Sequence, residues 1–122
     1  MNELNYASLE ASRKLKEAWI DIKTDILWIE SGHSWFKWFL GDHETASDLF
    51  PHSDTIPAPS LTEILRELPA YLVRETEYCH LTITKYKSFY VCCYDGTGLV
   101  CENINPTDAA IELLIWAKGY KP

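Results

Sequence analysis

The chain has 122 residues, 47% of them hydrophobic, which is typical of one globular domain with a single core over 1–122. Eighteen acidic and 11 basic residues give a formal net charge of −7. This balance argues against direct nucleic-acid binding, because that needs clustered Lys and Arg. No apolar segment follows the acidic start Met1–Leu4, so we expect no secretory signal, no membrane partner and a cytoplasmic location.

The first predicted element is a helix over Ser8–Trp19. Its apolar residues recur at helical spacing, whereas most of the charged residues between them face water. The predicted buried stripe consists of Ala11, Leu15, Ala18 and Trp19.

Two strands are predicted next, over Thr24–Glu30 and Ser34–Leu40, because both segments are rich in β-branched or aromatic residues. In the second strand, alternation separates two faces. We expect Phe36, Trp38 and Leu40 to face the core, and Trp35, Lys37 and Phe39 to form a partly exposed aromatic face.

A long acidic connection, Gly41–Pro59, follows, and a short strand over Ala46–Phe50 would shorten it. Ser60 and Glu63 then form a capping box at the start of a second helix.

Three strands are predicted in the C-terminal half, over Tyr78–Lys85, Ser88–Tyr94 and Leu99–Asn103, with a hairpin turn at Asp95–Gly98. A last helix begins after Asn105 and is apolar nearly all the way round, which indicates burial on most sides. The element order α-β-β-α-β-β-β-α predicts an α+β fold, with an antiparallel sheet of about five strands and helices on one face.

Three segments resemble a small protein family found in phages and prophages. Asn105–Ala117 is similar to the helix, opening with Asn-Pro-x-Asp-Ala-Ala, that ends the family's chains. Pro57–Leu65 resembles its Pro-Ala-Pro-Ser-Leu-x-Glu-Leu-Leu segment, and Ser8–Ile20 resembles its opening helix. Trp19 stands where relatives tend to have Gly. The resemblance implies a phage or prophage origin and a bacterial host cell; its motifs are structural and bring no catalytic residue or cofactor.

Two constellations carry candidate chemistry. His33, His43 and His52, with nearby carboxylates, are possible ligands for a divalent metal, although their spacing of nine or ten residues is not that of known zinc sites. Either Cys92 or Cys93 with His80 is a possible nucleophile and base across two strands. The alternative is that the thiols are reduced core residues and the histidines lie on a solvated surface.

The sequence therefore favours a binding protein over an enzyme and predicts no cofactor. A protein partner with a basic surface fits the net charge, and a host defence or nucleic-acid-handling protein is one hypothesis. Self-association into a homodimer through the Trp35 and Phe39 face and a metal-dependent enzyme are the alternatives. The candidate binding residues are Trp35, Lys37, Phe39, Asp42, Glu44, Tyr86 and Phe89.

Overall fold

The computed structural model describes residues 5–32 and 37–119. Its helices and strands follow the order α1 (Leu9–Glu17), β1 (Ile26–Glu30), β2 (Trp38–Asp42), α2 (His43–Leu49), β3 (Thr55–Pro57), α3 (Leu61–Glu67), β4 (Tyr71–Arg74), β5 (Glu77–Lys85), β6 (Tyr90–Tyr94), β7 (Cys101–Asn103) and α4 (Pro106–Lys118). The predicted α+β class is confirmed. Instead of one five-stranded sheet, the described residues form two antiparallel sheets, with strand orders β2-β1-β3 and β4-β5-β6-β7.

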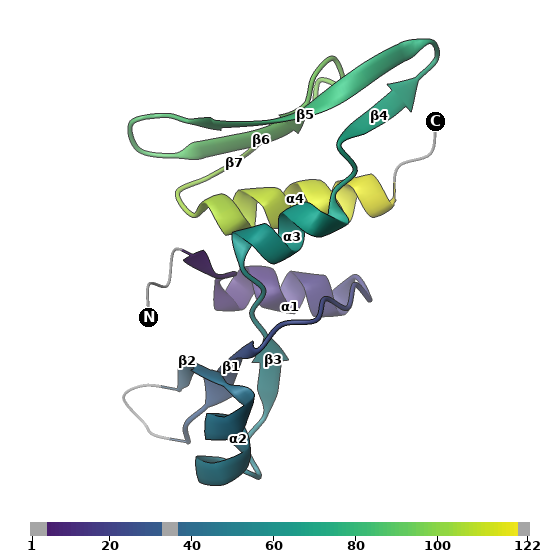
Figure 1. The fold of residues 1–122 in the computed structure, drawn as a ribbon. Helices are drawn as coiled ribbons and strands as arrows, with labels where there is room; N and C mark the ends of the chain where they lie inside the picture. The colour runs from purple at the N-terminus through teal and green to yellow at the C-terminus, as the bar shows by residue number, and fades with distance from the viewer. Residues whose placement is uncertain (1–4, 33–36, 120–122) are drawn as a thin grey trace.

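The elements are stacked in layers (Figure 1). The four-stranded sheet lies at one end of the molecule, and α4, with α3 beside it, covers one of its faces. Helix α1 forms the next layer, between α4 and the three-stranded sheet, and α2 packs on β1 and β2 at the other end. Helix α1 therefore joins the layer of α3 and α4 to the three-stranded sheet.

Helix α4 is buried as the sequence predicts. The side-chain oxygen of its N-cap, Asn105, accepts hydrogen bonds from the first turn, and Pro106 takes the first helical position, where its missing N–H costs nothing. Ile111, Leu113 and Leu114 have no exposed surface. Because the helix contacts α1, α3, β6 and β7, nearly every side of it meets protein.

The predicted strand within the 41–59 connection is wrong, since Ala46–Phe50 lies largely in helix α2. Asp42 caps this helix: its carboxylate accepts a hydrogen bond from the Thr45 N–H at 2.7 Å. Strand β4 was not predicted; it pairs with β5 through a tight turn in which Glu75 has a φ of +58°.

In the second strand, Phe39 is half-buried, so it is partly exposed as predicted, but it also packs on protein. Its ring lies 5.1 Å from that of Phe50 and packs against a small second core of Leu27, Ile29 and Ala46. Helix α2 packs on this face and leaves Phe39 half-buried. The opposite face meets α1, where the Arg13 guanidinium lies 5.4 Å from the centre of the Trp38 ring.

Candidate binding cleft

The turn that ends α1 places Trp19 in a backbone conformation that is uncommon for residues other than glycine. After Glu17, the Trp19 N–H donates to the Lys16 carbonyl at 3.1 Å, and the Ile20 N–H donates to the Leu15 carbonyl at 3.0 Å. These two bonds are a Schellman motif, which places one residue in the left-handed conformation. That residue is Trp19, with a φ of +59°. Glycine is the usual residue there, because a Cβ costs roughly 1–2 kcal/mol in this conformation.

Trp19 is also 94% exposed, so its predicted place on the buried stripe of α1 is wrong. Ala18 is exposed as well, because the helix ends at Glu17 and the left-handed turn redirects the chain. Ala11 and Leu15 are buried as predicted. The fold therefore leaves a large indole in water, at a site where a tryptophan is also conformationally unfavourable.

A cleft of about 310 Å³ opens beside this side chain, between α1, the segment 20–22 and the β3 region. We call it the Trp19 cleft. Its lining is mainly apolar, which is the usual character of binding pockets. The apolar residues that line it are Leu15, Trp19, Ile20, Ile22, Pro57 and Pro59.

The cleft also has a few polar groups. Lys16 and Asp21 line it with opposite charges and are both exposed, and Thr55 is a half-buried polar residue of the lining. Ser12 lines it as well but is only 1% exposed, and its Oγ has no hydrogen-bond partner among the described residues. Buried polar groups normally have a hydrogen-bond partner, and leaving a buried hydroxyl unpaired costs about 1–3 kcal/mol. The unpaired Ser12 Oγ therefore lowers the stability of the fold.

The residues predicted to form a binding surface are not brought together. Tyr86 and Phe89 stack at the β5–β6 turn, with ring centres 5.0 Å apart. Lys37, Asp42 and Glu44 are exposed near β2 and α2, at the opposite end of the stack (Figure 1). Hydrogen bonds from Thr45 lower the pKa of Asp42, as expected of a helix cap. Trp35 lies outside the described residues.

The predicted histidine ligands that the structure describes, His43 and His52, do not form a metal site. The Nε2 of His43 lies 3.1 Å from the Thr24 carbonyl oxygen, and His52 is exposed. Within residues 5–32 and 37–119, no three His, Cys, Asp or Glu side chains are grouped closely enough to hold a metal ion. His33 lies outside those ranges.

The structure places the two cysteines of the predicted cysteine and histidine pairs on opposite faces of β6. Cys92 faces the core, and burial raises its pKa to about 11, which is opposite to the change that a nucleophilic thiol requires. Cys93 points to the other face, where its Sγ lies 3.2 Å from the Thr82 hydroxyl. His80 is on the same strand as Thr82, but its ring packs 6.1 Å from that of Tyr71.

Sequence reasoning missed the Trp19 cleft, because the apolar spacing of α1 placed Trp19 on its buried stripe. No helix in the described part of the chain has the length and apolarity needed to cross a membrane. Comparison with protein-family models, with curated proteins and with solved structures finds no match to this chain.

Proposed function

We propose that this protein is a small phage- or prophage-type accessory protein that acts in a bacterial cell by binding another protein, without catalysing a reaction. One observation carries the proposal: Trp19 is exposed at the mouth of an apolar cleft, in a conformation that suits glycine. Tryptophan is enriched among the residues that dominate binding energies at protein interfaces. A residue that costs folding stability and gains nothing from burial is best explained by binding.

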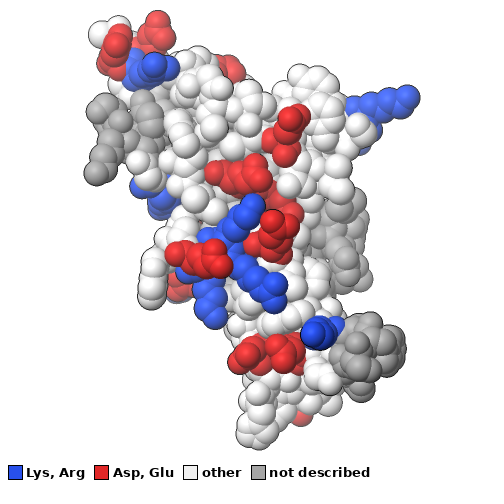
Figure 2. Space-filling model, turned by 180° about the vertical axis from the view of Figure 1, so that it is seen from behind, with Lys and Arg blue, Asp and Glu red and all other residues white. Residues whose placement is uncertain are grey.

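The charge distribution supports a partner with a basic surface. Figure 2 shows Lys and Arg gathered in the middle of one face, with Asp and Glu around and among them. Helix α1 itself carries more basic than acidic residues, since its sequence is LEASRKLKE. The excess acid of the chain therefore lies outside α1, and it would attract a basic partner and speed association. A host defence or nucleic-acid-handling protein is a partner of this kind.

The test compares three forms of the full chain as immobilised baits in bacterial lysates: the natural protein, Trp19→Gly and Glu75→Gly. Glu75 is the matched control, because it is the other described non-glycine residue with a positive φ and it lies in the β4–β5 turn, outside the cleft lining. We expect one protein to be captured by the natural chain and by Glu75→Gly.

Trp19→Gly should capture that protein at least about 30-fold less well, which corresponds to the 2 kcal/mol typical of a hot-spot residue. Quantitative mass spectrometry measures the captured amounts, and light scattering of each bait shows whether the captured partner is a second copy of the chain. Failure of the natural chain to capture any protein would refute the proposed function, and equal capture by Trp19→Gly would remove the observation that carries it.

A further inference from the structure

We propose that the Trp19 cleft binds a short extended segment of the partner protein, which pairs with the free edge of β3 and inserts one large apolar side chain ending in a hydroxyl or N–H group. This inference rests on the proposed function and names the chemistry of the partner. Four features of the cleft support it: a strand edge, an apolar lining, an unpaired hydroxyl and two opposite charges.

The strand edge comes from the register of the three-stranded sheet. The Glu30 N–H donates to the Asp54 carbonyl at 3.0 Å, and the Ala58 N–H donates to the Ile26 carbonyl at 2.9 Å. In an antiparallel pair, residues that bond the neighbouring strand alternate with residues whose backbone groups point away from it. The backbone groups of Thr55, between these bonds, therefore point away from β1.

Pro57 has the same orientation as Thr55, two residues further along β3. Proline has no N–H, and within sheets it is found on edges where that group would point outward. Both residues line the cleft, and β3 is the last strand of its sheet. An extended segment in the cleft therefore meets the Thr55 N–H and the carbonyl oxygens of Thr55 and Pro57, in the manner of strand addition.

The apolar lining determines what the segment must carry. A three-residue edge provides only a few backbone hydrogen bonds, so most of the affinity has to come from buried apolar area. At about 310 Å³, the cleft lies at the lower limit of small-molecule pockets. It suits one large side chain held against Trp19 and Pro57 better than the several anchors of an amphipathic helix.

The unpaired Ser12 hydroxyl indicates which chemical group should stand at the end of the inserted side chain. Ser12 is buried in the wall of the cleft, and its Oγ has no partner among the described residues. Rotation of the Ser12 side chain toward the cleft would let this hydroxyl bond an inserted hydroxyl or N–H group. Tyr and Trp carry such a group on an apolar ring. Lys16 and Asp21 add charge complementarity, because an acidic and a basic residue on either side of the inserted side chain can pair with them.

The experiment selects short linear peptides from a random displayed library on the immobilised full chain, then synthesises the consensus peptide. We expect one Tyr or Trp anchor with an acidic and a basic neighbour. Affinity should fall by about 30-fold or more in Trp19→Gly and be unchanged in Glu75→Gly. Replacing a Tyr anchor by Phe, which removes only the hydroxyl, should weaken binding to the natural protein roughly two- to tenfold, and this difference should vanish in Ser12→Ala.

Strand addition has its own readout. Methylating the backbone nitrogens of the peptide one at a time should weaken binding at every second residue, because only alternate N–H groups face β3. Amide resonances of Thr55 should shift on binding. The inference is overturned if no peptide is enriched, if methylation has no two-residue period, or if the anchor tolerates Phe equally in both proteins.

Failure of this inference can be distinguished from failure of the proposed function. If lysate capture depends on Trp19 but selected peptides bind as helices or elsewhere on the chain, the protein binds a partner through Trp19 without strand addition. If the natural chain captures no protein, the proposed function itself is wrong.

Discussion

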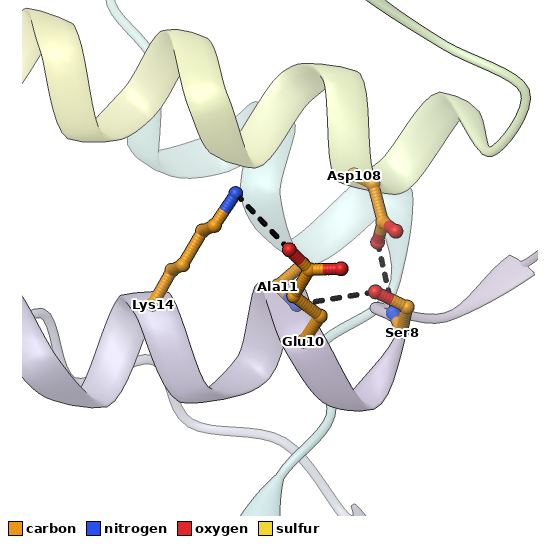
Figure 3. Close-up of polar contacts among 5 residues, drawn as sticks. All are labelled: Ser8, Glu10, Ala11, Lys14 and Asp108. Carbon is orange, nitrogen blue, oxygen red and sulfur yellow. Dashed lines mark hydrogen bonds and ion pairs between the residues drawn. The ribbon is translucent and has the colours of Figure 1, made fainter.

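The backbone N–H of Ser8 donates to the Asp108 carboxylate at 2.8 Å and so connects two residues that are 100 positions apart (Figure 3). Ser8 also caps α1, since its hydroxyl accepts a hydrogen bond from the Ala11 N–H at 3.1 Å. Asp108 lies in the first turn of α4 and is 8% exposed. The start of α1 is therefore attached to the start of α4, and this positions α1 between the two sheets.

Replacing Asp108 should test this connection. Asp108→Ala leaves the Ser8 N–H without its acceptor, and we expect the free energy of unfolding to fall by about 1–3 kcal/mol. Asp108→Asn keeps an oxygen that can accept the bond, so its loss should be smaller. Urea denaturation at neutral pH measures both variants, and equal losses would show that the charge of Asp108, rather than its hydrogen bond, stabilises the fold.

The pH dependence of stability should report the burial of the same carboxyl group. Burial raises the pKa of Asp108 above its ordinary value of 3.8, despite the hydrogen bonds from Ser8. The folded state then binds a proton more tightly than the unfolded state, so the contribution of Asp108 to stability falls as pH rises from 3.8 through the folded pKa.

Asp108→Asn isolates this contribution, because an amide does not titrate. The difference in unfolding free energy between the natural protein and the variant should shift in favour of the variant as pH rises through that range. A difference that shifts in favour of the natural protein would mean that its hydrogen bonds outweigh burial and lower the pKa.

Trp19→Gly should stabilise the protein even though it removes the largest side chain of the cleft. Glycine adopts the left-handed conformation without the Cβ clash, and an indole that is 94% exposed loses little contact. We expect a gain of about 1 kcal/mol in the free energy of unfolding, after the entropy that glycine adds to the unfolded chain. Thermal and urea denaturation measure it.

Glu75→Gly provides the comparison, because Glu75 has a φ of +58° in an exposed turn. The Glu75→Gly substitution should raise the free energy of unfolding by a similar amount. If Glu75→Gly gains stability and Trp19→Gly loses it, the indole contributes to folding and the argument that it is retained for binding fails.

The four thiols should differ in reactivity. Burial raises the pKa of both Cys92 and Cys101 to about 11, and Cys79 is also buried, whereas Cys93 is half-buried on the other face of the sheet. Reaction with an aromatic disulfide reagent at mildly alkaline pH should therefore modify Cys93 first, because the thiolate is the reactive form. Adding denaturant should make all four thiols accessible to the reagent, and mass spectrometry identifies the order in which they are modified. Early modification of Cys92 would contradict the buried position of its side chain.

Local signals predicted two helix starts at which a side chain bonds the nearby backbone. The Ser60 and Glu63 capping box is present at α3, and Asn105 caps α4. Asp42 caps α2 in the same way, but this cap was not predicted from the sequence, and neither was the helix. Strand β4 was missed for another reason: its four residues are mostly exposed, and pairing with β5 rather than an apolar pattern holds them in a strand.

The sequence by itself determined the α+β class, the caps of α3 and α4 and the burial of the last helix, because capping and apolar periodicity act over a few residues. Only the tertiary structure decided that the strands divide into two sheets with α1 between them, and that Trp19 projects beside a cleft with β3 along its other side. Those features depend on contacts between distant segments, such as that between Ser8 and Asp108. No local pattern encodes which surfaces such contacts leave open.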